Sequence, residues 1–590
     1  MTIARYKILK FSPLLLLPAI FGLQNLYPSI AVAAIHPQIA VWRYITIPLS
    51  GFIVGLTAYL FIKDQEIKLN KAELLAEKYK TLIIVFLCVV FGAFYWGLSV
   101  LRYLTLHTHS GELGWYDSKV WNIARSSSIG AALITAATGY FQPLLIIHGL
   151  LYKLNDSPLL IQFLQTLVVL LGVIPLYLTA KEHFPEDLWC VCFVVLYLLY
   201  PPVEYNSAME FHPDHLCIPL FLWAFYLIEK DRYRQALIAA GMGSLAKESL
   251  ILSGAFFGLY LYLVKGRFRL GWVSFIFYSL LFCLVIFFVQ PNLTTYYKNL
   301  GSVAHGSNFS YLIPSNSKGM ADYFSNIVRG ILTWKSKKML LIIFLLAPFL
   351  CLPLIAWKRF IPALPALMIP VFSLYPFHSA VDLQYTSAVI PSIFIGLILA
   401  MSRIRKRFGQ QRFTALFAWI FIMTLTFNII HSPMPISPNF WDEKWSALWN
   451  LDNYRKSSRY AILQETINLI PSDPAVKIVA QYNINHARLA HRRDYRIFPD
   501  GWEEADYILL DTGEPIISID VKFTPKEIYA TDKYLRAAEL MEEEYKKILA
   551  EIKHSGNYRI LKENNGIVLF ERIISFSGCH SRMPLSGIQF

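Results

Sequence analysis

The feature that most constrains this chain is a series of long apolar segments that recurs along its 590 residues. Most of these segments have about 16 to 25 residues, which as a helix is long enough, or nearly so, to cross the hydrocarbon core of a bilayer. The chain is 55% hydrophobic and only 16% charged, whereas about a quarter of the residues in soluble domains are charged. The sequence therefore predicts an α-helical polytopic membrane protein.

Counted by length, the segments predict about thirteen transmembrane helices. They lie at about 11–35, 44–62, 81–101, 159–180, 188–203, 214–229, 235–246, 249–264, 270–290, 339–356, 360–375, 385–402 and 412–430. The basic start of the chain and the apolar run behind it are expected to form an uncleaved first helix rather than a signal peptide. The semi-apolar stretch 129–152 is expected to lie along the membrane surface or to dip into it as a re-entrant piece.

Basic residues are concentrated in the short loops between the apolar segments. They lie at the N-terminus and at 63–80, 229–234, 265–269, 357–359 and 403–412. Counting spans puts all of these loops on one side, which the positive-inside rule identifies as the cytoplasm. The net charge of +14 thus follows from topology and does not indicate a nucleic-acid partner. The chain is predicted to lie in the cytoplasmic membrane, with the region after residue 431 outside the cytoplasm.

The composition changes near Trp441, after three prolines that mark a boundary. Residues 440–573 are predicted to form a small soluble α/β domain, and 574–590 an unstructured tail. The expected strands are Lys477–Ala480, Tyr507–Leu510 and a hairpin of Tyr558–Lys562 with Gly566–Glu571 around a turn at 563–565, and a helix is expected at 530–553. Before this domain, 1–80 is expected to form a transmembrane pair with a basic cytoplasmic loop, and 81–435 a transmembrane core with a large extracytoplasmic loop at 102–158.

Polar side chains gather in the predicted extracytoplasmic loops, while the helix centres carry almost no charge. The set comprises Glu112, Asp117, Tyr140, Gln142, Glu204, Glu210, His212, Asp214, His215, Lys247, Glu248, His378, Asp382, Gln384 and Tyr385. Ionisable groups at membrane depth are costly, and their placement usually means pairing or function. The pattern favours a site at the membrane–water boundary over an ion-coupled transporter, which usually needs ionisable groups near the midplane.

Each of these groups also has a plainer interpretation. Asp117 alone is more often a solvated loop acid, and Lys247-Glu248 is most simply a self-neutralising pair at a hairpin tip, although Lys247 is also suited to hold a lipid phosphate. Glu210 and His212 are spaced either to ligate a metal or to cap the helix behind Pro213. The basic patch at 486–493 is most simply a solvated face.

Four short stretches, in this order, resemble a prokaryotic family of multi-pass membrane proteins known as domain of unknown function 2079. Glu112-Leu-Gly-Trp-Tyr-Asp117, continuing to Trp121-Asn122, resembles its D-L-G-x-F-D-x-x-x-W-N signature. Further along, 140–143 (YFQP), 210–213 (EFHP) and 246–248 (AKE) resemble its H-F-S-P, D-F-H-P and V-K-E-D, and Gln384-Tyr385 also fits. The resemblance covers roughly 80–575. In this chain Glu112 replaces an Asp, Tyr140 replaces a His, and Ser249 stands where a second acid would follow.

This family in turn resembles the GT-C superfamily of membrane glycosyltransferases, which take a sugar from a polyprenyl-phosphate carrier. The resemblance implies a GT-C-like core and a catalytic carboxylate in the first large extracytoplasmic loop, for which Asp117 is the candidate and Glu112 its neighbour. Residues implied in substrate or lipid-phosphate binding are Lys247, Glu248, Glu210, His212, Tyr140, Gln142, His378, Gln384, Tyr385, Arg102 and Trp115. No metal ligands are assigned, and the candidate cofactor is a divalent cation, Mg²⁺ or Mn²⁺.

Three functions from different classes follow from these features. The first is an inverting glycosyltransferase that uses a polyprenyl-phosphate sugar donor and a lipid, glycan or protein acceptor, with Asp117 as base and Lys247 at the phosphate. The second is a non-catalytic membrane protein for lipid or polysaccharide transport, for which Gln162 and Gln165 are the few mid-span polar residues. The third is an assembly factor whose soluble domain binds a partner, in which case Asp117 is dispensable.

Overall fold

The structure is a computed structural model, and it describes most of the chain. The described residues are 37–65, 69–108, 110–293, 328, 330–332, 335–373, 376–441, 449–481, 484, 486–493, 495–499, 501–512 and 545–573. The first predicted span, at 11–35, and most of the polar stretch 291–337 lie outside these residues.

The chain divides into two compact units, each built from two stretches of sequence. The first unit is Met1–His107 with Lys119–Arg455, and the second is Thr108–Ser118 with Lys456–Phe590. The second unit thus takes eleven residues, 108–118, from the first large predicted loop. The division of the membrane part at residue 80 stays a prediction.

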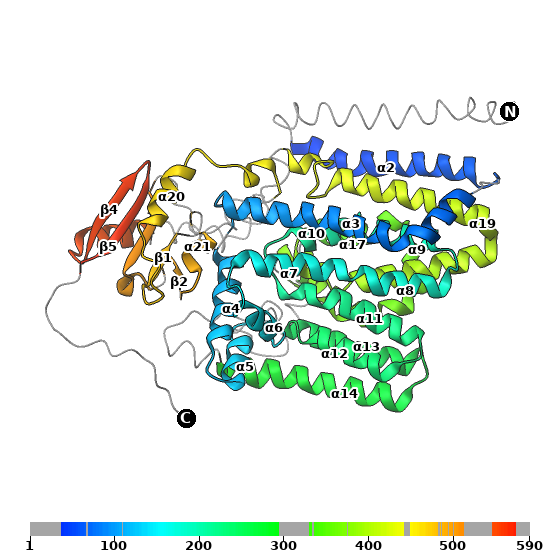
Figure 1. The fold of residues 1–590 in the computed structure, drawn as a ribbon, viewed down its shortest axis with the longest axis horizontal. Helices are drawn as coiled ribbons and strands as arrows, with labels where there is room; N and C mark the ends of the chain where they lie inside the picture. Colours follow the sequence, from blue (N-terminus) through cyan, green and yellow to red (C-terminus); the bar gives the residue numbers. More distant parts are fainter. Residues whose placement is uncertain are drawn as a thin grey trace. The chain divides into compact units, whose positions relative to one another are not determined.

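The first unit is helical, and Figure 1 shows its long helices running side by side, with the short helices α5 and α6 at one end of them. The helices are α2 (Pro37–Ile62), α3 (Asn70–Leu104), α5 (Ile129–Ala137), α6 (Leu145–Tyr152), α7 (Pro158–Leu171), α8 (Val173–His183), α9 (Asp187–Leu198), α10 (Pro201–Ala208), α11 (Cys217–Glu229), α12 (Tyr233–Ser244), α13 (Ile251–Leu263), α14 (Phe268–Leu284), α17 (Lys335–Leu346), α18 (Leu364–Phe372) and α19 (Ile390–Ile430). Helix α4 (Trp115–Arg125) joins the two units.

Six helical segments of the described chain are long and apolar enough to cross a membrane, or seven if the bent pair α9–α10 is one span. The predicted number of about thirteen is therefore not confirmed. Helices α11, α12 and α13 have only 12 or 13 residues, which is short of the roughly 20 that a full crossing needs. The predicted spans 385–402 and 412–430 correspond to two helices on either side of Gly409, which together make up α19. Gly409 has a non-helical backbone with a φ of +83°.

The stretch 129–152 forms α5 and α6, which have nine and eight residues. At 1.5 Å per residue, each is about half as long as a membrane crossing requires. Ser128 begins α5 by accepting a hydrogen bond from the Ala131 N–H, as N-cap residues do.

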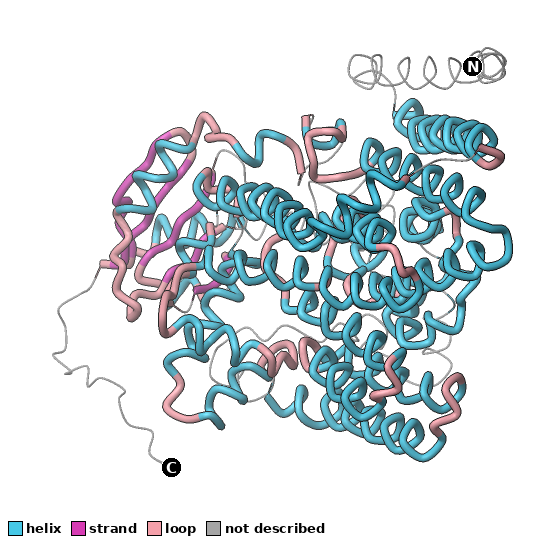
Figure 2. The backbone as a smooth tube through the Cα atoms, turned by 45° about the vertical axis from the view of Figure 1, so that its right-hand side comes forward, coloured by secondary structure: helices cyan, strands magenta, loops and turns pink. Residues whose placement is uncertain are grey.

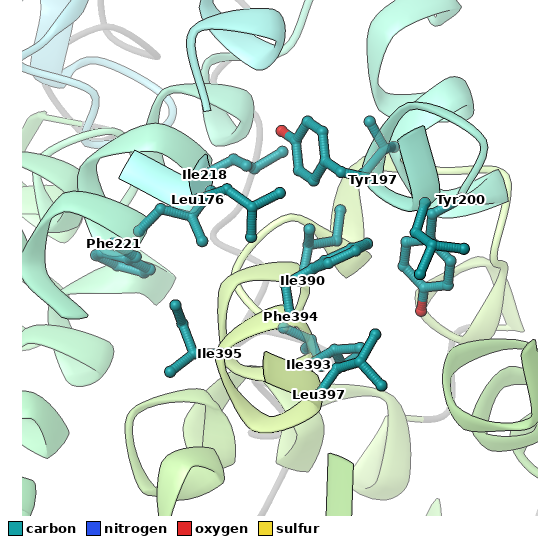
Figure 3. Close-up of a cluster of buried hydrophobic side chains, with 14 of the residues drawn as sticks. Leu176, Tyr197, Tyr200, Ile218, Phe221, Ile390, Ile393, Phe394, Ile395 and Leu397 are labelled. Atoms are coloured by element: carbon teal, nitrogen blue, oxygen red, sulfur yellow. The ribbon is translucent and has the colours of Figure 1, made fainter. Parts of the chain in front are cut away.

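The core of the first unit is formed where the first half of α19 packs against α8, α9 and α11. Figure 3 shows Ile390, Ile393, Phe394 and Leu397 of α19 among Tyr197, Tyr200 and Leu176. Phe394 makes edge contacts with both tyrosine rings, at centroid distances of 5.2 and 5.5 Å. The tyrosine hydroxyls donate to main-chain carbonyls of Val169 and Leu345, so that the buried polar atoms are satisfied.

Ion pairs connect the ends of the helices at which the basic loops lie. They are Lys80–Asp187 (2.7 Å), Lys181–Asp187 (2.6 Å), Arg405–Glu186 (2.5 Å), Lys230–Glu182 (2.6 Å), Lys265–Glu229 (3.5 Å) and Arg359–Glu229 (2.7 Å). Loops that were predicted to share the cytoplasmic side therefore meet at one end of the helices. Except for Lys181–Asp187, each pair joins two segments that are far apart in sequence.

The second unit contains a mixed sheet of five strands in the order β2-β1-β3-β5-β4, and Figure 2 shows its strands gathered in one region. The strands are β1 (Ile478–Ala480), β2 (Tyr495–Ile497), β3 (Tyr507–Asp511), β4 (Tyr558–Asn564) and β5 (Ile567–Arg572), and the unit also contains α20 (Tyr460–Asn468) and α21 (Ala487–Ala490). Strands β2, β1 and β3 are parallel, and β5 pairs antiparallel with β3 and β4.

The predicted hairpin is present as β4 and β5, but its turn is at Asn565 and Gly566 rather than at 563–565. Both residues have positive φ, +46° and +81°, which a two-residue hairpin turn of type I′ requires and which an Asn-Gly pair supplies. Of the helix predicted at 530–553, only 545–554 is described and is helical. Its Tyr545, Ile548 and Ile552 are buried against the sheet.

Candidate functional site

The predicted site residues lie in both units. In the first unit, Lys247 precedes the short turn before α13 and is almost fully buried. Its Nζ lies 3.2 Å from both carboxylate oxygens of Asp214. The same ammonium lies over the rings of Tyr140 and Tyr385, at 5.1 and 5.7 Å from their centroids, within reach of a cation–π interaction. The interpretation of Lys247-Glu248 as a self-neutralising pair is thus wrong, because the partner of Lys247 is Asp214.

Glu248 is fully buried and turns toward the loop before α6. Its Oε2 accepts a hydrogen bond of 3.1 Å from the Phe141 N–H, and its Oε1 has no partner among the described residues. Burial raises the pKa of Glu248 to about 7, although the positive charge of Lys247 opposes the rise. A carboxyl group with such a pKa is able to gain or lose a proton near neutral pH.

Lys119 is a candidate site residue that the sequence interpretation missed. Its buried ammonium donates to the carbonyl oxygens of Thr138 (2.9 Å) and Tyr140 (3.0 Å) and to Oε1 of Gln142 (2.9 Å). Burial lowers the pKa of Lys119 to about 7, against the opposing charge of Glu248. The sequence does contain a signal for the burial of Lys119. It follows Tyr116 by three residues and precedes Val120 by one, so in a helix it lies on the buried face of α4 that these two residues form.

His378 and Gln384 complete this part of the first unit. Nδ1 of His378 lies 2.7 Å from the Ser373 hydroxyl, and its ring contacts that of Tyr385 at 4.6 Å. Burial, with a further contribution from Lys247, lowers the pKa of His378 to about 3, so that the ring is neutral. Gln384 and Tyr385 line a cavity of about 20 Å³ together with Asp214, which is room for about one water molecule.

We call this group the lysine cluster. It has seven members, each of which is a predicted site residue or a direct hydrogen-bond or ion-pair partner of one. Its members are Lys119, Tyr140, Gln142, Asp214, Lys247, Glu248 and Tyr385. With both lysines and both carboxyl groups ionised, its formal charge is zero. Uptake of one proton by Glu248 makes the cluster cationic, which favours an anionic ligand.

Arg102 and Glu210 are also brought together in the first unit. The Arg102 guanidinium lies 3.3 Å from Oε1 of Glu210 and over the ring of Trp449 at 5.6 Å. Nδ1 of His212 lies 2.9 Å from the Glu210 carbonyl oxygen. The side chain of His212 makes no capping hydrogen bond to the helix at Pro213–Leu216, so the capping interpretation is wrong for this residue.

In the second unit, Asp117 is not the solvated loop acid of the plainer interpretation. Glu112 lies in the turn Ser110–Gly114, Trp115 begins α4, and both are half-buried. The Trp115 ring contacts the Tyr116 ring at a centroid distance of 4.7 Å. The Asp117 side chain is 0% exposed, and its Oδ2 lies 2.8 Å from Nδ1 of His491. The patch at 486–493 is correspondingly not a merely solvated face.

The candidate divalent cation finds no matching donor set. Within the described residues, no group of three or more His, Cys, Asp or Glu side chains is placed to hold a metal ion. Both oxygens of Asp214 face the Lys247 ammonium. No step is therefore derived through a metal.

The fold and site define a polytopic helical membrane protein with a buried ionisable cluster in its membrane unit and a small mixed-sheet unit. The family model described as predicted membrane protein (DUF2079) matches residues 102–569. The chain belongs to this family, which confirms the prediction made from the motifs at 112–122, 210–213 and 246–248. No curated protein shows a significant match to the chain.

Among solved structures, the chain is similar to ArnT from Cupriavidus metallidurans. The apo crystal structure matches with 13% identity and a TM-score of 0.44, over 83% of this chain and 99% of that chain. The structure bound to undecaprenyl phosphate matches with 12% identity and a TM-score of 0.40, over the same shares of the two chains. At these scores the similarity does not establish a common fold.

Proposed function

We propose that this protein transfers a sugar from a polyprenyl-phosphate-linked donor to an acceptor on the extracytoplasmic face of the cytoplasmic membrane. The observation that carries the proposal is the lysine cluster. It places a buried ammonium, two aromatic rings and a carboxyl group of raised pKa together in a unit made of apolar helices. These are the groups that a phosphate, a sugar ring and a proton transfer require.

Lys247 is assigned to the donor phosphate. A charge-assisted hydrogen bond to an anion is about twice as strong as a neutral one, and burial strengthens it further. Without a donor, Asp214 neutralises Lys247. When the phosphate binds, it therefore replaces Asp214 as the partner of the Lys247 ammonium or shares the ammonium with it. Developing negative charge on the leaving phosphate is then stabilised where it forms.

The rings of Tyr140 and Tyr385 are assigned to the sugar, whose apolar face packs on aromatic surfaces. The lipid tail of the donor finds an apolar surface on the same unit. Helices α3, α7 and α8 line a groove of about 500 Å³ with side chains such as Val85, Trp96 and Leu167. Its lining is almost entirely apolar, which suits a polyprenyl chain.

Asp117 is assigned to the acceptor side of the reaction, with Glu112 nearby in sequence. The support for this role is its burial, since a carboxylate that is 0% exposed in the first turn of a helix is held there by specific partners. The acceptor class, the sugar and the extracytoplasmic position of the second unit belong to this proposal.

The proposal predicts product formation that depends on Lys247. Purified protein in liposomes is given undecaprenyl-phosphate-linked hexoses and pentoses with a radiolabelled sugar, and transfer to membrane acceptors is counted. Lys247→Met should lower kcat/KM by about 10- to 100-fold, the equivalent of one charge-assisted hydrogen bond. Lys230→Met is the control, because Lys230 pairs with Glu182 at the opposite ends of the helices.

Removing Lys247 leaves Asp214 buried without its partner, which by itself destabilises a protein. The double variant Lys247→Met/Asp214→Asn removes both charges and separates loss of folding from loss of phosphate binding. Full transfer by a folded double variant contradicts the assignment of Lys247. Lipid or glycan flux without any transferred sugar contradicts the enzyme assignment as a whole.

A further inference from the structure

Asp117 and His491 form a carboxylate–imidazole pair within the second unit. Oδ2 of Asp117 and Nδ1 of His491 are 2.8 Å apart, although the residues are 374 positions apart in the chain. Helix α4 supplies the acid, and the turn that ends α21 supplies the histidine.

Hydrogen bonds on both sides of the pair fix the two segments against each other. Before it, the Thr108 hydroxyl lies 2.9 Å from Nε2 of His486, and the Ala487 N–H donates to the Thr108 carbonyl (3.3 Å). After it, the Ser118 hydroxyl donates to the Arg493 carbonyl at 2.9 Å. The His491 N–H donates to the Ala487 carbonyl (3.1 Å). The imidazole is therefore anchored through its own backbone as well as its ring.

The hydrogen bond sets the tautomer of His491. A carboxylate only accepts hydrogen bonds, so Nδ1 carries the proton and Nε2 keeps its lone pair. The exposure of the two side chains then decides which of them meets a substrate. The Asp117 side chain is 0% exposed and that of His491 is 24% exposed. A hydroxyl arriving from solvent can thus contact the partly exposed His491 ring, whereas the Asp117 side chain is not accessible to it.

We propose that His491 is the catalytic base of the sugar transfer and that Asp117 is its positioning residue. This inference rests on the proposed function. The acceptor oxygen forms a bond to the anomeric carbon as the bond from that carbon to the phosphate oxygen breaks, and the electron pair leaves with the polyprenyl phosphate. The acceptor proton passes to Nε2 of His491, and the Asp117 carboxylate stabilises the resulting imidazolium.

A merely structural hydrogen bond would have the same distance, so the test uses a measurement that such a bond does not affect. His491→Ala removes the base and leaves a partly exposed space into which imidazole can diffuse. Transfer from undecaprenyl-phosphate-linked radiolabelled sugars should fall by about 10²- to 10⁴-fold. Added imidazole should restore a measurable part of it. The acid limb of the pH profile of kcat/KM should be lost in His491→Gln.

Asp117→Asn should also lower kcat by 10²-fold or more, since an amide can donate to Nδ1 and hold the wrong tautomer. Imidazole should not rescue this variant, because His491 still occupies the position. His554→Gln is the matched control, as His554 is an exposed histidine of the same unit that bonds only within its own helix.

The outcomes separate the two proposals. Wild-type transfer with an equally active His491→Ala overturns the role of His491 and leaves the enzyme assignment standing. The role of His491 is also overturned if His491→Ala folds but is inactive and imidazole does not restore its activity at any concentration. The Asp117–His491 hydrogen bond is then structural. Absence of transfer by the wild type from every donor overturns both proposals together.

Discussion

At the scale of single residues, burial controls the chemistry of the lysine cluster. Glu248 is fully buried, and its pKa rises from the ordinary value near 4.5 to about 7. Lys119 is also buried, and its pKa falls to about 7. Both shifts have desolvation as their largest cause, and each side chain keeps hydrogen-bonding partners. The cluster is therefore poised to change its charge near neutral pH.

The raised pKa of Glu248 makes stability depend on pH. Between about pH 4.5 and 7 the folded state keeps a proton that the unfolded chain has released, so the free energy of unfolding decreases as pH rises through this window. Glu248→Gln retains an acceptor for the Phe141 N–H and removes the titration. Its stability relative to wild type should increase by on the order of 1–3 kcal/mol from pH 4.5 to 7.

Thermal unfolding in detergent at several pH values measures this difference. The exposed Glu77, changed to Gln, is the control, and it should show no such trend. A stability difference between Glu248→Gln and wild type that stays constant from pH 4.5 to 7 would show that Glu248 is ionised throughout.

At the scale of elements, α13 and α14 approach each other through glycines. A Cβ at Gly258 would lie 2.7 Å from the Phe275 nitrogen and 2.8 Å from the Gly271 carbonyl oxygen. These are backbone atoms, which cannot rotate away. Small residues that allow such close backbone contact are typical of helix pairs in membranes, where dispersion replaces the hydrophobic effect as the driving force.

Gly258→Ala should accordingly force the two helices apart and destabilise the protein by several kcal/mol, as overpacking against rigid neighbours does. Gly97→Ala in α3 is the comparison, since a Cβ there meets nothing within 4 Å. It should be neutral or stabilise by about 1 kcal/mol through helix propensity. Melting temperatures of the two purified variants test this difference, and equal melting of Gly258→Ala and wild type would refute the close-contact argument.

At the scale of the whole molecule, the second unit includes residues 108–118, which in the sequence lie between the two stretches that form the membrane unit. A chain that ends at Arg455 retains the helices and the lysine cluster but lacks every partner of Asp117 in 486–493. This chain should insert into the membrane and bind no acceptor, and its transfer activity should be lost.

Protease added outside intact cells provides the measurement. It should cut the truncated chain within 108–118 and leave this segment uncut in the full-length chain, where the Asp117 side chain is 0% exposed. Protection of the segment in the truncated chain would contradict either its packing or its extracytoplasmic position. A cellular function that is lost on truncation, kept by Asp117→Ala in the intact chain and unaccompanied by sugar transfer would instead favour the assembly-factor hypothesis.

The sequence by itself determined the membrane class, the family, the shared side of the basic loops and the β4–β5 hairpin. Each depends on local patterns, namely the length of apolar runs, short motifs and two strand-like runs around a short turn. Only the tertiary structure decided that Lys247 pairs with Asp214, that Lys119 belongs to the site and that His491 meets Asp117. These partners lie 19 to 374 residues apart, and spacing along a chain carries no information about such contacts. The predicted number of spans is not confirmed for the described residues, because hydropathy alone does not show where a helix breaks or stops short.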